Sequence, residues 1–195
     1  MTELDTHSQI LAAAEARFSL YGYNKTTMAE IAGDCNMSAA NLYRYFENKL
    51  DIGAALANQC LVEKEHELEL IVTDDSMSCA EKLQAFILYV LHYTYHHFDT
   101  SPKISELIEA MTDQRPEVMQ SHRQSKLALI CQLLEQSQQT GEFSFSDIDQ
   151  TAEAINTAIS IFYLPTVMPM FSLEEFERKA DAVCTLLLKG LTHSG

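Results

Sequence analysis

The segment with the richest chemistry covers residues 38–49, Ser-Ala-Ala-Asn-Leu-Tyr-Arg-Tyr-Phe-Glu-Asn-Lys. The Asn41 amide can pair with adenine through two hydrogen bonds, and the Arg44 guanidinium can pair with guanine or bind a phosphate. Donors suited to backbone phosphates follow on Tyr43, Tyr45 and Lys49. These residue types predict a helix that contacts DNA; a tyrosine-rich packing helix is the alternative.

Helical spacing positions these groups. The Ser38 hydroxyl is a predicted N-cap, because it can accept from backbone N–H groups that a first helical turn leaves unpaired. Leu42 and Phe46 are four residues apart, so they share one face and can pack inward. Ala39 and Ala40 are small and allow the helix to approach a surface closely.

Two further helices are predicted before this segment. Apolar residues recur at helical spacing in the first of them and end at a glycine, a common C-terminal stop: Ile10, Leu11, Ala14, Phe18 and Gly22. Thr27 and Glu30 have the spacing of a capping box, which predicts the start of a second helix. Residues 33–36, Gly-Asp-Cys-Asn, predict a tight turn before Ser38. Two short helices joined by such a turn form a helix-turn-helix unit, which the first helix supports.

Residues 8–55 resemble the N-terminal domain of the TetR (tetracycline-repressor) family without a gap. The matching positions are Ile10 to Ala14, Phe18, Gly22-Tyr23, Thr26-Thr27, Ile31-Ala32, Met37-Ser38, Leu42 to Phe46 and Asn48-Lys49. The resemblance implies an all-α, dimeric, ligand-responsive transcriptional regulator. We predict no enzyme activity, because no catalytic constellation with meaningful spacing is present, and we predict no cofactor. Repression, with release from DNA on effector binding, is the commoner mode in that family.

The resemblance also implies roles for individual residues. Thr27 is expected to touch a phosphate, as are Tyr43, Tyr45 and Lys49, whereas Ser38, Ala39, Ala40 and Asn41 are expected against base edges or the nearby backbone. Two features depart from the family pattern. Ala40 stands where glycine is common, and residues 1–8 contain no Lys or Arg that could form a basic arm in the minor groove.

Charge argues against a general nucleic-acid binder. The chain of 195 residues has a net charge of −15, whereas such proteins are normally basic. Residues 1–60 contain four Lys or Arg against seven Asp or Glu, and the remainder contains nine against 21. We therefore predict a selective DNA binder with few phosphate contacts, which relies on placed side chains and oriented backbone N–H groups.

Several localisation signals are absent from the sequence. No apolar run approaches the roughly 20 residues that span a bilayer, and the N-terminus does not resemble a signal peptide. The five cysteines are scattered, odd in number and form no CxxC pair, which predicts free thiols in the cytoplasm. Cys35 lies beside the predicted turn, where it is either a buried structural thiol or a site at which oxidation affects DNA binding.

The rest of the chain predicts an all-α fold of about nine helices. We expect residues 1–50 to form the helix-turn-helix domain, and residues 51–195 a helical domain that binds an effector and dimerises. The predicted helices extend to about residue 71, then cover 79–98, 103–113 and 116–139, with two more after the predicted N-caps Ser146 and Ser172. Capping boxes are predicted at Ser78–Glu81 and Ser172–Glu175.

The last two long helices, the eighth and the ninth, are too apolar for a single buried stripe, and Pro165 and Pro169 separate them. In the family the corresponding helices form the homodimer interface, and two-fold symmetry then predicts a palindromic double-stranded DNA operator. Completion of a monomer core is the alternative.

Two possible ligand sites lie in the predicted body. Aromatic and methionine side chains that can line an apolar effector pocket, or simply pack in a core, are Phe86, Tyr89, Tyr93, Met111 and Met119. His92 and His96 have the spacing of metal ligands on one helix face, with His97, His122 or Glu106 as a possible third ligand. A metal-dependent sensor or enzyme using His92, His96 and His97 is thus an alternative function, although exposed histidines near a helix end need no metal. We predict no metal, because no HExxH motif or other catalytic constellation is present.

Overall fold

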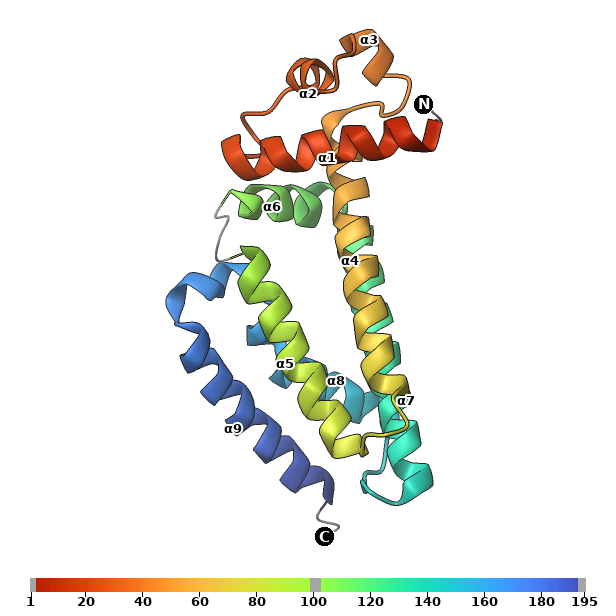
Figure 1. Ribbon diagram of the computed structural model, residues 1–195. Helices are drawn as coiled ribbons and strands as arrows, with labels where there is room; N and C mark the ends of the chain where they lie inside the picture. The colour runs from red at the N-terminus through yellow and green to blue at the C-terminus, as the bar shows by residue number, and fades with distance from the viewer. Residues whose placement is uncertain (1–2, 99–102, 193–195) are drawn as a thin grey trace. The chain divides into compact units, whose positions relative to one another are not determined.

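The computed structural model describes residues 3–98 and 103–192 (Figure 1). The described ranges are mostly helical and contain no strand, which confirms the all-α prediction. The chain divides into two compact units. Unit 1 comprises Met1–Val62 and Ser101–Ser121, and unit 2 comprises Glu63–Thr100 and His122–Gly195. None of the helices in the described ranges is long and apolar enough to cross a membrane.

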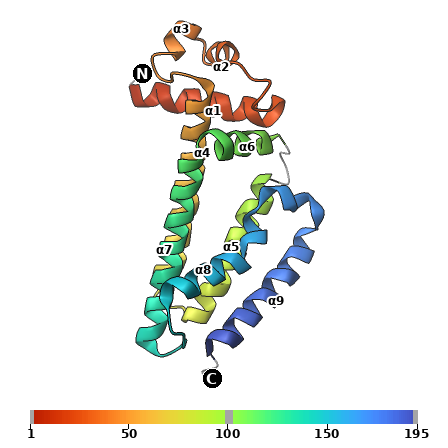
Figure 2. The same cartoon turned by 180° about the vertical axis from the view of Figure 1, so that it is seen from behind.

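Unit 1 is built on three N-terminal helices and a fourth that comes from the middle of the sequence. Its helices are α1 (Glu3–Tyr21), α2 (Met28–Asp34), α3 (Ala39–Leu42), the first part of α4 (Lys49–Thr73), α6 (Ile104–Gln114) and the start of α7 (Pro116–Thr140). Helix α6 packs against α1, as the view from behind in Figure 2 also shows. The core of the unit contains apolar residues from all of these helices, among them Ile10, Phe18, Ile31, Leu42, Ile52 and Met111.

The predicted start and stop signals of unit 1 are where the sequence places them. Helix α1 ends before Gly22, which has a φ of +93°. Thr27 and Ser38 are the N-caps of α2 and α3. Helix α3 is shorter than a typical recognition helix, because α-helical geometry ends at Leu42 and a turn follows. The buried Phe46 still donates its backbone N–H to the Leu42 carbonyl, so both predicted inward residues reach the core.

Unit 2 is arranged around α5 (Cys79–Phe98), which packs against the C-terminal elements. These are α8 (Ile148–Ala158), the 3-10 helices η1 (Ser160–Tyr163) and η2 (Pro165–Met170), and α9 (Leu173–Thr192). Helix α5 contacts η1, η2 and, most extensively, α9. The remaining parts of α4 and α7 complete the unit.

Two predictions about the C-terminal elements were wrong in detail. The N-cap of α8 is Asp147 rather than Ser146, because the Asp147 carboxylate accepts from the Gln150 N–H at 2.8 Å. The eighth helix is also not long: it ends at Ala158, and the apolar run continues in two 3-10 helices. The capping boxes at Ser78–Glu81 and Ser172–Glu175 are confirmed by their hydrogen bonds.

Candidate nucleic-acid interface

A complete capping box fixes the start of α2. The Glu30 N–H donates to the Thr27 hydroxyl at 3.3 Å, and the Thr27 N–H donates to the Glu30 carboxylate at 2.8 Å. Thr27 has an extended backbone and an exposed side chain. The Thr27 hydroxyl also donates to the Glu30 carboxylate at 2.8 Å, so its donor and its acceptor are both engaged within the capping box.

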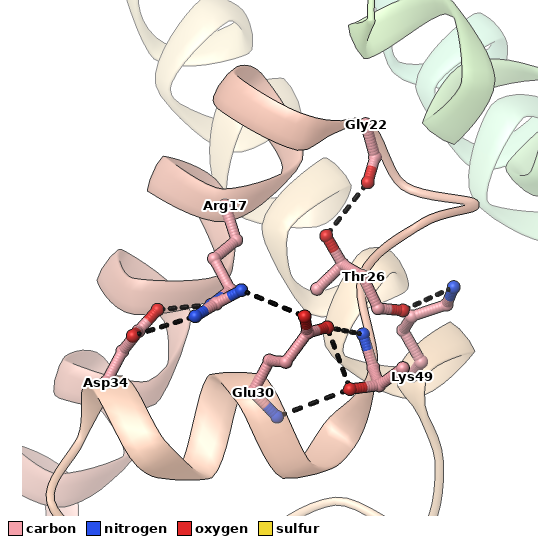
Figure 3. Close-up of polar contacts among 7 residues, drawn as sticks. Arg17, Gly22, Thr26, Glu30, Asp34 and Lys49 are labelled. Carbon is pink, nitrogen blue, oxygen red and sulfur yellow. Dashed lines mark hydrogen bonds and ion pairs between the residues drawn. The ribbon is translucent and has the colours of Figure 1, made fainter.

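An arginine on α1 connects that helix to both ends of α2 (Figure 3). The Arg17 guanidinium forms a bidentate pair with the Asp34 carboxylate and lies 3.5 Å from the Glu30 carboxylate. The hydrogen bond from Arg17 lowers the pKa of Asp34. The pKa of Glu30 is lowered chiefly by the hydroxyl and N–H of Thr27, with a smaller contribution from Arg17. These contacts of Arg17 hold α2 against α1. The Arg17–Asp34 pair joins residues 17 positions apart, so sequence spacing did not predict it.

Helix α3 and the turn that follows it, residues 43–45, carry several polar side chains. Tyr43 is 53% exposed, Arg44 is exposed, and Asn41 and Tyr45 are half-buried. The Ser38 hydroxyl accepts from the Asn41 N–H at 3.2 Å, which fixes the first turn. The small residues Ala39 and Ala40 are half-buried and exposed respectively, so their side of α3 lacks bulky side chains. The structure thus leaves the side chains of Tyr43 and Arg44 accessible. The Asn41 amide donates to Met37 Sδ at 3.9 Å, and Tyr45 packs against the core of unit 1.

Lys49 is a predicted phosphate contact whose ammonium group is also engaged inside unit 1. Its Nζ donates to the backbone carbonyls of Tyr23 at 2.6 Å and Thr26 at 2.9 Å, with a longer contact of 3.4 Å to Asn24. It also lies 4.3 Å from the centre of the Tyr23 ring. All three N–H donors are therefore directed at the loop that precedes α2, and Figure 3 shows the bond to Thr26. We infer that Lys49 positions this loop.

Helix α6 holds the same loop from a distant part of the sequence. The Glu106 carboxylate accepts from the Asn24 N–H at 2.8 Å, and the ammonium of Lys103, the residue before α6, donates to the Leu20 carbonyl in the last turn of α1. A Cβ atom on Gly22 would lie 2.8 Å from Glu106 Oε2, so the glycine is needed for this close approach as well as for its positive φ. Sequence analysis missed this role of Glu106, which depends on a tertiary contact.

Cys35 is a structural thiol in unit 1. Its side chain is 5% exposed, and Sγ contacts the Gln9 carbonyl at 3.7 Å. Burial raises the pKa of the Cys35 thiol, which lowers the thiolate fraction on which oxidation depends. These observations favour the structural alternative over a redox-sensitive one.

The five residues predicted to line an effector pocket belong to different units. Phe86 is fully buried in the core of unit 2, where Tyr89 packs against that core. Tyr93 is half-buried on the same helix, and its ring centre lies 6.0 Å from that of Tyr89. Met111 is buried in the core of unit 1, and Met119 packs against it. Only the three aromatic residues therefore remain candidates for an effector site within unit 2.

The histidine cluster on α5 pairs with protein groups. His92 Nε2 lies 2.8 Å from the Glu177 carboxylate, and His97 Nδ1 lies 2.8 Å from the Tyr93 carbonyl. The rings of His92 and His96 are 6.3 Å apart between centres. Within residues 3–98 and 103–192, no group of three or more His, Cys, Asp or Glu side chains is disposed to hold a metal ion. The structure therefore gives no support to the metal-dependent alternative.

Comparisons with known proteins match both parts of the chain. The family model described as "Bacterial regulatory proteins, tetR family" matches residues 10–56. The model described as "Tetracyclin repressor-like, C-terminal domain" matches residues 79–184, more than half of the chain. The HTH-type transcriptional regulator YhgD of Bacillus subtilis is 26% identical over 149 residues, which cover 76% of this chain and 78% of that protein.

Two solved structures illustrate the likeness in fold. SmeT, the repressor of the Stenotrophomonas maltophilia multidrug efflux pump SmeDEF, is 20% identical with a TM-score of 0.70, over 97% of this chain and 91% of SmeT. The regulator FadR from Bacillus subtilis, solved in complex with stearoyl-CoA, is 18% identical with a TM-score of 0.69, over 94% of this chain and 98% of FadR. At these identities the structures show a shared fold.

Proposed function

Because the chain belongs to the tetracycline-repressor (TetR) family of transcriptional regulators, we propose that it represses transcription from a palindromic operator until a small effector binds. The observation on which this proposal chiefly depends is the capped α2–α3 pair, with polar side chains exposed on α3 and α1 packed behind it. We assign DNA binding to residues 1–50, and effector binding and dimerisation to residues 51–195. A regulator of chromosomal genes acts in the cytoplasm, which the five free cysteines also suit.

We propose two kinds of contact on the α2–α3 surface. Base edges are met by the amide of Asn41 and, through close backbone approach, by the turn around Ser38, Ala39 and Ala40. Phosphates are met by the backbone of the first turn of α2 after Thr27, by Tyr43 and Tyr45, and by Arg44 where it does not reach a guanine. The exposure of Tyr43 and Arg44 supports phosphate contacts for these two side chains. Asn41 is half-buried and directly follows the small residues Ala39 and Ala40, where the backbone can approach the bases closely.

The homodimer is proposed to form through the C-terminal elements of unit 2. Large apolar side chains are exposed there in the single chain: Ile161 (36%), Leu164 (44%), Met170 (66%) and Leu186 (72%). Leu186 lies on α9 and the other three lie in or beside η1 and η2. Large exposed apolar side chains in neighbouring elements favour a subunit interface. The half-buried side chains of Val183 and Leu187 add to the apolar character of α9.

The effector is proposed to bind within unit 2, and to be a mainly apolar or aromatic molecule. The half-buried tyrosines of α5, Tyr89 and Tyr93, support this chemistry, because aromatic side chains with a polar tip are common in ligand sites. The acyl chain of the ligand bound to FadR shows that this fold admits large apolar effectors in another protein.

Selection of genomic fragments by the purified protein, at near-physiological salt, tests the proposed function. We expect enrichment of one or a few palindromic sites with half-sites about one helical turn apart. Failure to enrich any fragment at any salt concentration, with protein shown to be free of bound effector, would contradict the proposal. Enriched sites then serve as operators for measurements on variants.

Two variants separate the proposed kinds of contact. Asn41→Ala is expected to change base preference at one position of each half-site, with a loss of about 1–3 kcal/mol on the preferred base. Tyr43→Phe is expected to weaken binding to all sequences by a similar factor, because a phosphate contact does not depend on the base. If both variants change affinity in the same way on every operator variant, the assignment of roles is wrong.

A further inference from the structure

Two lysines are buried in unit 2 without a carboxylate partner. The side chains of Lys64 on α4 and Lys126 on α7 are 5% and 2% exposed. Within the described ranges, neither ammonium forms a hydrogen bond or an ion pair; each instead faces an aromatic ring. Lys126 Nζ lies 3.1 Å from the centre of the Tyr163 ring, and Lys64 Nζ lies 5.2 Å from that of Tyr93. Such burial of an amine is costly, since its charged form loses hydration.

The two lysines lie in one cluster. His122 and Lys126 are four residues apart on α7, and His122 interacts electrostatically with both Lys126 and Lys64. Glu65 is the carboxylate that interacts electrostatically with Lys64, and it is already paired with His122 Nδ1 at 2.8 Å. The cluster thus contains two amines and an imidazole, and the carboxylate beside Lys64 is paired.

Burial, together with the excess of basic groups, lowers the pKa values in this cluster. Burial lowers the pKa of Lys126 to about 6, with a further contribution from Lys64, and burial lowers the pKa of Lys64 to about 8. Burial also lowers the pKa of His122 to about 4, against the opposing effect of its bond to Glu65. At pH 7.5 an anion placed between these groups would return Lys126 to its charged form, because an adjacent negative charge raises the pKa of an amine.

We propose that Lys64 and Lys126 form the receptor for a carboxylate group of the effector, whose apolar or aromatic body packs against Tyr93 and Tyr163. The inference rests on the effector-dependent regulation proposed above and adds the chemical class of the effector, a monocarboxylate. An Asn156 side chain, 3% exposed, lies 3.2 Å from the Tyr163 hydroxyl and keeps that ring in place over Lys126. Neighbouring charges are paired, since Arg123 contacts Glu153 at 2.8 Å.

Matched ligand pairs test the charge requirement. Benzoate and octanoate are each compared with their primary amides, benzamide and octanamide, by titration calorimetry on the full-length protein. We expect at least one carboxylate to bind ten times or more tightly than its amide. Equal binding of both members in each pair, or binding of none of the four, would overturn the proposal.

Variants locate the preference in the cluster. Lys126→Met keeps the side-chain volume and removes the amine, so the preference for the carboxylate should fall to within twofold. Lys64→Met should reduce it in the same direction. Lys179→Met is the matched control, because Lys179 Nζ also lies over a ring, 4.5 Å from the centre of Phe171, but is exposed on α9. It should keep the preference intact. A preference unchanged in Lys126→Met would overturn the proposal.

A measurement on the unmodified protein is independent of how the variants fold. Because Lys126 is largely neutral at pH 7.5 in the free protein, carboxylate binding should take up close to one proton per chain, detected by calorimetry in buffers with different ionisation enthalpies. The affinity should then fall up to about tenfold per pH unit from pH 7 to pH 9. The charged or titratable groups around Lys126 that bear on this measurement are Lys64, Glu65, His122, Arg123, Glu153, Tyr93 and Tyr163. Binding without proton uptake would contradict the proposal.

Stability and DNA binding give two further checks. A lysine that only supports the fold would lower the melting temperature when replaced, whereas Lys126→Met should leave the ligand-free melting temperature equal or higher, because a buried amine is removed. Operator binding by the unmodified protein is measured separately. Absence of operator binding with a clear carboxylate preference would refute the proposed function alone; the reverse result would refute this inference alone.

Discussion

Replacing Lys49 by methionine distinguishes two roles that the sequence does not separate. A lysine at the start of α4 can bind a DNA phosphate, as the family resemblance implies, or it can fix the loop before α2, as its contacts to the Tyr23 and Thr26 carbonyls indicate. Methionine keeps most of the side-chain volume and removes all three donors. The positioning role predicts a loss of stability and an unchanged salt dependence of operator binding. The phosphate role predicts unchanged stability and a weaker salt dependence.

The magnitude follows from the contacts of the ammonium group. Two of its hydrogen bonds, at 2.6 and 2.9 Å, are of ordinary length, and the third, at 3.4 Å, is weak. Hydrogen bonds of charged groups contribute about 1.5–3 kcal/mol each when well buried, but Lys49 is half-exposed and water replaces part of the loss. We therefore expect Lys49→Met to lower the free energy of unfolding by about 2 kcal/mol. For a chain of this size that corresponds to a decrease in melting temperature of about 4–8 °C.

Operator affinity is measured over a range of salt concentrations for Lys49→Met, with Arg44→Ala as the comparison. Each phosphate contact contributes about −0.9 to the slope of log K against log salt concentration. If Lys49 positions the loop, its variant has a lower affinity at every salt concentration but an unchanged slope. If Arg44 binds a phosphate in each subunit, its variant flattens the slope by about 1.8. A normal melting temperature for Lys49→Met together with a slope flattened by that amount would refute the positioning role.

Three further predictions concern packing, acid stability and assembly. Gly53→Ala should lower the free energy of unfolding, measured by chemical denaturation, by about 1–3 kcal/mol, because the new Cβ would lie 2.7 Å from Leu107 Cδ1. An unchanged denaturation midpoint would show that α6 moves to accommodate the methyl group. Arg17 lowers the pKa of Asp34 by its hydrogen bond, so the contribution of this pair to stability is present above pH ~4 and is lost as the pH falls through the lowered value. Arg17→Gln should therefore reduce the melting temperature at pH 7 and flatten its decrease between about pH 5 and pH 3; parallel pH curves for the two proteins would contradict this. Leu186→Glu should convert the dimer to a monomer in analytical ultracentrifugation, whereas Val62→Glu, a substitution at another exposed residue (63%), should remain dimeric; a dimeric Leu186→Glu would exclude this surface of α9.

Local signals explain which parts of the fold the sequence predicted. The capping boxes at Thr27 and Ser172 depend on residues three apart, and the stop at Gly22 depends on one residue's access to positive φ, so each can be recognised without tertiary information. Ser146 and Asp147 are both favourable N-cap residues. The prediction of Ser146 was wrong, because Asp147 is the N-cap of α8. Local preference alone does not separate two such adjacent residues.

Long-range contacts explain what the sequence did not predict in the candidate sites. Glu106 reaches the Asn24 backbone across 82 residues, and nothing around Glu106 in the sequence distinguishes it from other glutamates on helix surfaces. Lys64 and Lys126 likewise lie in charged, polar stretches that suggest solvent-exposed helix faces. Their burial depends on elements that pack over them from elsewhere in unit 2. Sequence patterns therefore located the α2–α3 pair. They did not predict the contacts of Glu106 or the burial of Lys64 and Lys126, which depend on residues far apart in the chain.

The engagement of two basic residues inside unit 1 changes how an acidic chain can bind DNA. Residues 1–60 contain only Arg17, Lys25, Arg44 and Lys49 as permanent cations. Arg17 is paired with carboxylates and Lys49 with backbone carbonyls, which leaves Lys25 and Arg44 exposed. Counterion release from so few contacts contributes little affinity. We therefore expect affinity for DNA to come mainly from oriented N–H groups and hydroxyls of the α2–α3 pair. The internal contacts of Arg17 and Lys49 thus contribute to DNA recognition by holding that pair in one geometry.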